Sequence, residues 1–553
     1  MSPLDNFKPI RHPAWDVWSN PILRRYCRSR LRPRGLSVAI LIIVLLAGFT
    51  MAIAFTIGTR VGMRFDDAAR AGIIPLLILQ SLILFIMGTA QVSGGMITER
   101  DEGVIDYQRL IPMTPLAKVM GYLFGLPIRE YLLVLATLPF TAWCLWNGHV
   151  AFGAWLPMYV VLASSTLLYH ITGLVAGTVI RNRRWAFLFS IGLVFCLYTV
   201  VPQMANYGLV FFKYLTITPA VKECYPGILP SGAGAAARLE QSIFPAVKFF
   251  NLNFSETVFT VFSQGGFVLT FAIMLCRKWR RTESHLLGKI WATGFFIWIQ
   301  ILLLGNALPL IEPGTLFPLR GLARATRMMH ELVPKPEEAV LMSGIYGCVT
   351  MILIFSLGGI ITPSAHHQLR EWRRARKQER TSLPWRADAS TSFWFVGVMV
   401  LAGAVGWFLF TRALVESVWF PGHAVPLSVL GYFTAVMLGG GVGFQVLLET
   451  KGVRVLGLAV ILAGAVPIMT GAVLGVIKGM SPIASWIMAV SPASLPFYAA
   501  GSLLSISELP MEIARAMPMA FYFWLAVLDL TTLWLILRLH TMRRKMARSV
   551  LED

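Results

Sequence analysis

The stretch LSVAILIIVLLAGFTMAIAFTIG, residues 36–58, contains no charged side chain and decides the class of fold. About 20 apolar residues in a helix cross roughly 30 Å of hydrocarbon, so this block is long enough to span a bilayer. Its apolar residues are continuous rather than alternating, which predicts a helix and not a barrel strand. The block is too long for a signal peptide and lacks a convincing small-residue cleavage site, so we interpret it as a retained anchor.

Similar apolar blocks recur along the whole chain of 553 residues. The composition is 56% hydrophobic and only 14% charged, against about 25% charged residues in soluble domains. These blocks predict an all-α polytopic membrane protein with about twelve transmembrane helices. The candidate spans are 36–58, 72–96, 120–146, 154–180, 185–205, 255–276, 290–310, 340–362, 391–412, 425–448, 455–477 and 518–539.

The distribution of basic residues predicts the orientation. The net charge is +21, and 32 of the 48 Lys and Arg lie in stretches that share one side if the N-terminus is inside. Basic loops face the cytoplasm, so we expect both termini there, in a multi-pass protein of a bacterial-type inner membrane. The basic residues lie between spans and form no separate domain. The expected partner is therefore membrane lipid and not nucleic acid. The seven stretches are 1–35, 97–118, 181–184, 277–290, 363–390, 449–454 and 540–553.

The hydropathy pattern predicts two six-helix pseudo-repeats, 36–280 and 281–540. A cytoplasmic amphipathic segment, 1–35, precedes them, and a cytoplasmic tail, 541–553, follows. Each half has one long external loop, 206–254 or 478–517. The apolar pieces of these loops are broken by Pro and Gly and are mostly too short to span, which predicts interfacial or re-entrant hairpins.

Two GxxxG pairs lie in candidate spans. Gly173 and Gly177 lie in the fourth span, and Gly439 and Gly443 lie in the tenth. Small residues at this spacing let two helix backbones approach closely, so we expect helix packing at both pairs.

The segment ITERDEGVIDYQRLIPMTPLAK, residues 97–118, is the most informative for function. It is densely charged at its start and returns to apolar sequence through two prolines. Ile97, Val104, Ile105 and Leu110 supply apolar contacts, while the acidic residues stay polar. This pattern predicts a short amphipathic helix along the cytoplasmic face.

The same segment resembles the connection after the second span of type-2 ABC transporter permeases, the transmembrane subunits of ABC exporters. The resemblance implies that 97–118 is a coupling helix seated in a cleft of a separate ATPase subunit. NPILRRYCRSRLRP, 20–33, is similar to the amphipathic N-terminal helix of that family, and 206–254 is similar in placement to its re-entrant loop. The resemblance is strongest over 1–280. The matching residues are Glu99, Arg100, Glu102, Gly103, Asp106, Thr114, Pro115 and Leu116.

The second half departs from the family pattern. Its corresponding connection, TPSAHHQLREWRRARKQERTSLPWRAD at 362–388, is longer, strongly basic and without ER-x-E-G. It either docks an ATPase differently, contacts anionic lipid, or is a solvated positive-inside loop.

The chain contains no GxxxxGK[ST] phosphate cradle, so ATP-driven transport would need ATP and Mg²⁺ on a partner subunit. We expect a permease subunit rather than an enzyme, with no cofactor, catalytic residue or metal site of its own. Substrate would move between the two helix bundles when the ATPase pushes the coupling helix. Apolar walls slightly favour a lipid-like or amphipathic cargo.

Three ionisable residues within candidate spans are functional hypotheses, because charges in hydrocarbon are costly. Asp529 either contacts substrate or forms a structural hydrogen bond, helped by Thr531 and Thr532. Arg129 and Glu130 form either an interfacial ion pair or a pore site. An ion-gradient-driven secondary transporter and a structural subunit of a membrane complex remain the alternative functions.

Overall fold

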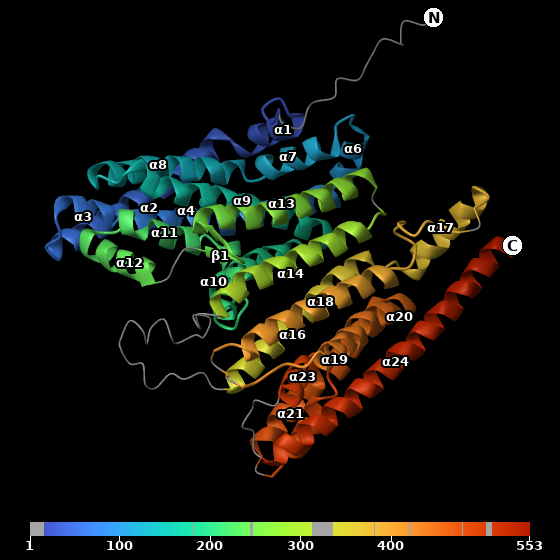
Figure 1. Ribbon diagram of the computed structural model, residues 1–553. Coiled ribbons are helices and arrows are strands. Elements are labelled where there is room, and N and C mark those ends of the chain that lie inside the picture. The colour runs from blue at the N-terminus through green and yellow to red at the C-terminus, as the bar shows by residue number, and fades with distance from the viewer. Residues whose placement is uncertain are drawn as a thin grey trace, which may run out of the picture. The chain divides into compact units, whose positions relative to one another are not determined.

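The computed structural model describes residues 16–552, except 181, 244–246, 282, 312–335, 381, 419, 421, 478 and 505–510. It confirms an all-α polytopic membrane protein (Figure 1). The described residues contain 11 helices that are long and apolar enough to cross a membrane. They are Pro33–Arg60, Phe65–Asp101, Ile128–Asn147, Phe152–Val179, Arg183–Asn206, Glu256–Arg280, Lys289–Ile311, Pro336–Ile361, Phe393–Val415, Ser428–Val476 and Glu512–Val550.

The first of these helices shows why a bilayer is needed. Leu41, Leu45 and Phe49 of α2, Pro33–Arg60, are all more than half exposed. A row of exposed large apolar side chains would be unfavourable in water, but it is the expected surface against lipid tails.

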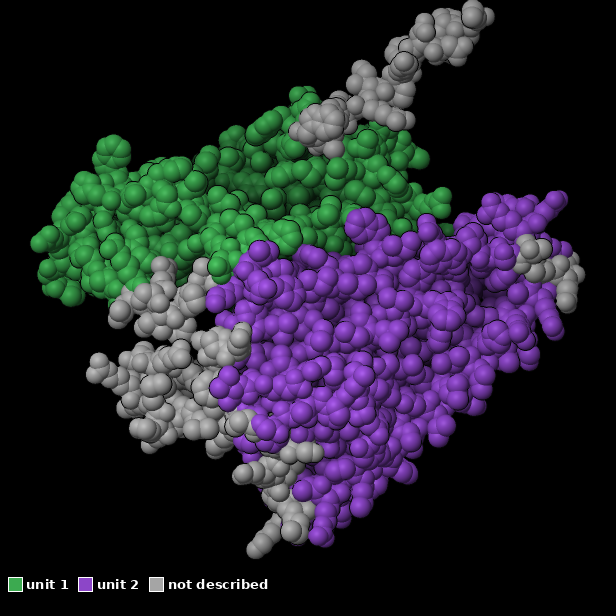
Figure 2. All heavy atoms as spheres, viewed as in Figure 1, with its two compact units in different colours: residues 1–203, 212–247, 253–284 green, residues 204–211, 248–252, 285–553 purple. Residues whose placement is uncertain are grey.

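The chain divides into two compact units, which Figure 2 colours separately. Unit 1 comprises residues 1–203, 212–247 and 253–284, and unit 2 comprises 204–211, 248–252 and 285–553. We describe each unit by itself.

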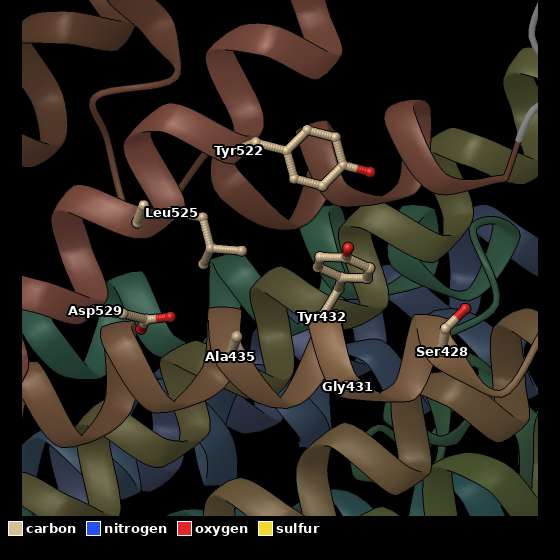
Figure 3. A pocket seen from close by; sticks show the side chains of 8 residues that line it. Ser428, Gly431, Tyr432, Ala435, Tyr522, Leu525 and Asp529 are labelled. Atoms are coloured by element: carbon tan, nitrogen blue, oxygen red, sulfur yellow. The ribbon is translucent and has the colours of Figure 1, made fainter.

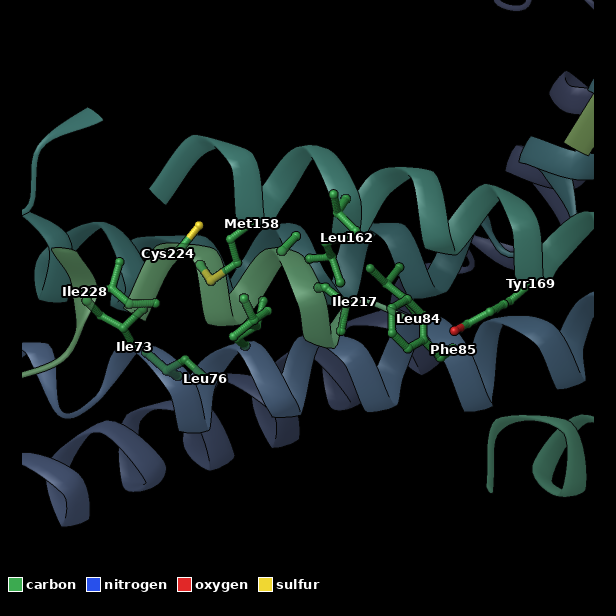
Figure 4. Close-up of a cluster of buried hydrophobic side chains, with 14 of the residues drawn as sticks. Ile73, Leu76, Leu84, Phe85, Met158, Leu162, Tyr169, Ile217, Cys224 and Ile228 are labelled. Atoms are coloured by element: carbon green, nitrogen blue, oxygen red, sulfur yellow. The ribbon is translucent and has the colours of Figure 1, made fainter. Parts of the chain in front are cut away.

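Unit 1 contains the long helices from α2 to α13 and several short elements, but residues 204–206 of α10, 210–211 of η2, 248–249 of β1 and 252 of β2 belong to unit 2. Its largest core lies where α4, η1, α9 and α11 meet, and Ile73, Phe85, Met158 and Ile217 are among its members (Figure 4). The elements are α1 Pro21–Arg30, α2 Pro33–Arg60, α3 Phe65–Arg70, α4 Ile73–Ser81, η1 Leu82–Gly88, α5 Thr89–Asp101, α6 Val104–Leu110, α7 Pro115–Gly125, α8 Ile128–Asn147, α9 Phe152–Val179, α10 Arg183–Asn206, η2 Val210–Leu215, α11 Thr218–Ile228, α12 Ser231–Ile243, β1 Val247–Phe249, β2 Leu252–Phe254 and α13 Glu256–Arg280.

Unit 2 packs α14, α16 and α18 through both aromatic and polar contacts. The Trp407 ring stacks on Phe433 with centroids 3.6 Å apart, and its indole N–H donates to Ser343 Oγ at 3.0 Å. Such bonds satisfy polar groups that hydrocarbon cannot. The elements are α14 Lys289–Ile311, α16 Pro336–Ile361, α17 Ala365–Lys377, α18 Phe393–Val415, α19 Ser428–Met437, η3 Leu438–Val442, α20 Gly443–Ala459, η4 Val460–Ala465, α21 Val466–Val476, α22 Ser481–Met488, α23 Leu495–Leu503 and α24 Met511–Glu552.

Wider π-helical turns interrupt two of the long helices: η1 in unit 1, and η3 and η4 in unit 2. In η1 the carbonyl of Leu84 lies 2.9 Å from His170 Nε2, and in η3 the carbonyl of Gly439 accepts from Thr532 Oγ1 at 3.2 Å. In η1 and in η3 a side chain from another helix therefore compensates a backbone carbonyl, which hydrocarbon requires.

The tenth and eleventh expected spans form one continuous helical segment, Ser428–Val476, of 49 residues. A straight helix of that length would measure about 74 Å, more than twice the hydrocarbon thickness. The backbone is non-helical at Gly452, where φ is +78° and ψ is 177°. This kink lies within the polar turn expected at 449–454, and it separates two pieces that are each long enough to cross.

In their described parts the expected external loops contain short helices, one two-stranded hairpin and, at 511–517, the start of α24. The first holds η2, α11, α12 and the β1–β2 hairpin, and the second holds α22 and α23. Residues 244–246 and 505–510 of these loops, and 1–15 of the N-terminal segment, lie outside the described residues.

Candidate functional site

The segment 97–118 folds as the end of α5, a sharp turn, the short helix α6 and the start of α7. Gly103 makes the turn with φ at +72°, a conformation that glycine adopts without steric cost. Thr114 caps α7 by accepting a hydrogen bond from the Ala117 N–H at 3.2 Å, and Pro115 occupies the first turn of that helix. Both residues are typical of a helix start, so their role here is to set the direction of α7.

Glu99 is buried inside unit 1 rather than displayed on its surface. It is 7% exposed and forms an ion pair with Arg25 of α1. The Tyr122 hydroxyl of α7 lies 3.2 Å from Glu99 Oε2 and 2.7 Å from Gln108 Oε1 of α6. The carboxylate thus connects α5 directly to α1 and, through Tyr122, to α6 and α7.

Arg100 points to the end of a different helix. Its guanidinium donates to the carbonyl oxygen of Ile180 at 2.9 Å and to that of Gly177 at 3.3 Å, at the C-terminal end of α9. A cation at this position neutralises the negative end of the helix dipole and satisfies carbonyls that have no helical partner. Arg100 therefore fastens α5 to α9.

The exposed face of α6 combines acidic and apolar side chains. Glu102, at the turn, and Asp106 are exposed, and Asp106 pairs with Arg109 one turn later. Tyr107 is 70% exposed and Leu110 is 81% exposed. The opposite face buries Ile105 in a core formed by α1, α5, α7, α9 and α13. We call the surface of Glu102, Asp106, Tyr107 and Leu110 the α6 face.

A close packing of α1 on α7 supports this arrangement. Asn20, before α1, donates to the Ala117 carbonyl at 2.7 Å, and a β-carbon at Gly125 would lie 2.6 Å from the Tyr26 ring. Burial raises the pKa of Tyr26 to about 12, so this phenol stays neutral at physiological pH. The ring lies beneath the guanidinium groups of Arg25 and Arg30.

The eight matching residues of 97–118 therefore divide into two groups. Glu99 and Arg100 join helices and Thr114 and Pro115 start α7, whereas Glu102 and Asp106 are on the surface, together with Gly103 and Leu116. The sequence pattern alone could not separate these groups, because both contain charged residues.

Unit 2 contains a buried carboxylate that the sequence analysis missed. Glu449 of α20 is 3% exposed, pairs with Arg543 of α24 and accepts a hydrogen bond from Gln368 of α17 at 2.7 Å. As in unit 1, a helix with a π turn ends at a buried glutamate, and a left-handed glycine, Gly452, follows. In the sequence, a glutamate at the end of an apolar block, followed by a glycine three residues later (ETKG, 449–452), could have indicated this buried carboxylate.

The helix of the basic segment 362–388 resembles α1 in its contacts. Gln368 of α17 binds the buried Glu449, and Arg25 of α1 binds the buried Glu99. Each of these amphipathic helices also precedes a long apolar helix, α2 or α18. In these contacts α17 resembles α1 rather than the segment 97–118.

The glycine pairs each face another helix of the same unit. β-Carbons at Gly173 and Gly177 would approach Thr89 and Met96 of α5 to 3.1 and 2.7 Å. β-Carbons at Gly439 and Gly443 would approach Asp529 Oδ1 and Thr532 Oγ1 of α24 to 2.6 and 2.7 Å. Both pairs lie at helix contacts where a larger residue has no room.

The three intramembrane ionisable residues have different surroundings. Glu130 is buried, its Oε2 has no hydrogen-bond partner, and no ion pair with Arg129 forms among the described residues. The expected ion pair is therefore absent, because neighbouring residues on a helix point about 100° apart. Asp529 lines an open groove with Tyr432 and Tyr522, and Thr532 bonds to Gly439 rather than to Asp529.

No group of three or more His, Cys, Asp or Glu in the described part of the chain could hold a metal ion. A scan against models of protein families, a search of curated proteins and a search of solved structures each found no match.

Proposed function

We propose that the chain is the transmembrane permease subunit of an ATP-driven exporter related to the type-2 ABC permeases. A separate ATPase subunit binds the α6 face and drives transport. In this proposal the α6 face and both termini lie in the cytoplasm, and the membrane is a bacterial-type inner membrane. The observation that carries the proposal is an exposed acidic and apolar helix face whose opposite side places Ile105 in a core to which five other helices contribute.

The contacts of α6 supply a route for mechanical force. A push on α6 reaches α7 through Gln108 and Tyr122, and reaches α5 and α1 through Glu99 and Arg25. Arg100 then carries the displacement of α5 to the end of α9. Packed helices move as units rather than deforming continuously, so a small movement at α6 shifts several helices together.

The nucleotide site belongs to the partner in this proposal. The sequence contains no Walker phosphate cradle, so ATP and Mg²⁺ would bind the ATPase subunit. Docking by Tyr107 and Leu110 would bury apolar surface, while Glu102 and Asp106 would select a basic cleft.

The test uses the full chain copurified with an ATPase encoded beside it and reconstituted in proteoliposomes. Reversing the surface charges in the double variant Glu102→Lys, Asp106→Lys should lower transport-coupled ATPase activity at least tenfold, while membrane insertion is unchanged. Glu337→Lys, which alters an exposed carboxylate in the first turn of α16, is the matched control. Full coupling in the double variant would remove the proposed role of the α6 face. Transport by the isolated chain without ATP would refute the whole proposal.

An ion-gradient-driven transporter is the second candidate, because Asp529 is an intramembrane carboxylate that lines a groove. The same proteoliposomes distinguish the two functions. A proton gradient without ATP should drive no uptake or efflux if the ATPase supplies the energy.

A further inference from the structure

A groove of about 460 Å³ lies between α19 and α24 inside unit 2 (Figure 3). Tyr432 and Ala435 of α19 form one side, and Tyr522 and Leu525 of α24 form the other. Asp529 lies at one end of the groove, and among the described residues that line the groove it is the acidic one. The groove is therefore apolar along its length and negative at one end.

Within the described part of the chain, the carboxylate at this end has no partner. Asp529 Oδ1 is buried and accepts no hydrogen bond, and no Lys or Arg of the described residues forms an ion pair with it. Glu99 and Glu449, by contrast, each have an arginine. A buried polar atom without a partner is rare in folded proteins, and in hydrocarbon it indicates a site that another molecule satisfies.

The two tyrosines add a second attraction for positive charge. The ring centroids of Tyr432 and Tyr522 lie 5.5 Å apart at an interplanar angle of 62°, and both residues are partly exposed. The faces of aromatic rings carry partial negative charge and attract cations, and the rings also provide flat apolar surface.

The groove opens on the surface of the unit. A β-carbon at Gly431, within the lining, would meet no atom within 4 Å. Leu530 and Leu533 of α24, beside Asp529 in sequence, are more than half exposed. This helix therefore has a lipid-facing surface, and a ligand can reach the groove from the bilayer.

We propose that this groove binds a lipophilic organic cation, such as an amphipathic amine, with its positive charge at Asp529 and its apolar part along Tyr432 and Tyr522. This binding does not depend on the proposed function. The further statement, that such cations are the exported substrate class, rests on the proposed function.

The test measures binding of tetraphenylphosphonium to the full chain in nanodiscs of zwitterionic lipid. Tetraphenylborate, which has a similar shape and the opposite charge, controls for simple partition into apolar surface. We expect saturable binding of the cation and none of the anion. Asp529→Asn should weaken binding at least tenfold, and Glu512→Gln, which changes an exposed carboxylate in the first turn of α24, should not.

A second variant tests the groove without changing the carboxylate. Gly431→Leu fills open space and should also weaken binding at least tenfold, with an unchanged unfolding temperature. Equal binding of both ions, or full cation binding by Asp529→Asn, would overturn the proposal. Binding of the cation without ATP-dependent transport of it would instead leave the groove assigned as a binding site and refute only the statement that such cations are the exported substrate class.

Discussion

Three buried or half-buried carboxylates show how the protein treats charge at the residue scale. Glu99 and Glu449 each join an arginine from another helix, and both sit near a left-handed glycine. No arginine of the described residues pairs with Asp529, which lines a groove. The first two therefore hold helices together, whereas the third is available to a ligand.

The two ion pairs should differ in their contribution to stability. Arg25 is 44% exposed at its side chain, but Arg543 is only 22% exposed and Glu449 is fully buried at its side chain. Arg543→Ala should cost about 3 kcal/mol, because it leaves the buried charge of Glu449 without a countercharge. Arg25→Ala should cost about 1 kcal/mol, because solvent already screens the half-exposed guanidinium and the Tyr122 hydroxyl still donates to Glu99.

Equilibrium unfolding in mixed micelles would measure both losses. Arg28→Ala, at an exposed position of α1, is the control and should change stability by less than about 0.5 kcal/mol. Equal losses for Arg25 and Arg543 would contradict the prediction.

His285 should make unit 2 sensitive to acid. Burial lowers the pKa of His285, and Asp388, His367 and Lys289 are the ionisable groups that face it. Its neutral ring lies 2.8 Å from the Ile360 carbonyl through Nδ1. Because the folded-state pKa is lower than the unfolded value of about 6.5, the stability is full above that pH and is lost as the pH falls.

The matched variant for this prediction is His285→Gln, which cannot titrate. When the pH is lowered from about 7.5 to about 5.5, the unfolding temperature of the wild type should fall further than that of the variant. An identical loss in both proteins would show that other groups dominate the acid response.

At the scale of elements, glycines decide which helices come together. Gly173 and Gly177 place α9 against α5, the helix that ends at Glu99 and Arg100. The same helix pair is fastened at its end by the Arg100 contacts to α9. The position of the α6 face therefore depends on the close packing of α9 against α5, the helix that precedes α6.

Gly177→Leu should lower the free energy of unfolding by about 2 kcal/mol, because overpacking forces the two helices apart. The current separation leaves only 2.7 Å between a β-carbon at this position and Met96 Cβ. Gly192→Leu in α10, where a β-carbon meets nothing within 4 Å, is the control and should be nearly neutral. A neutral Gly177→Leu would mean that α5 and α9 do not pack closely.

At the scale of the whole molecule, the turn at Gly452 determines the topology. If Ser428–Val476 were a single crossing, every later segment would lie on the opposite side of the membrane. A twelve-span topology would instead place 449–454 on the same side of the membrane as the α6 face. Because Lys451 is exposed in this turn, a reagent that cannot cross the membrane can report on which side the turn lies.

Labelling with a membrane-impermeant maleimide would decide it, in a background without native cysteines. Glu102→Cys and Lys451→Cys should both react in inside-out vesicles and not in intact cells. Arg64→Cys, between α2 and α3, should react in intact cells. Reaction of Lys451→Cys from outside would exclude the twelve-span topology.

The sequence by itself determined the fold class, because uncharged blocks such as 36–58 have only one stable arrangement in hydrocarbon. It also located the α6 region, since 97–118 interrupts apolar sequence with a regular amphipathic pattern. Only the tertiary structure separated buried Glu99 from exposed Glu102, and only it paired α17 with Glu449. The physical reason is that hydropathy and charge depend on single residues, whereas burial and partners depend on helices far apart in the chain. For the same reason Asp529 was visible in the sequence, but the absence of a partner for its Oδ1 was not.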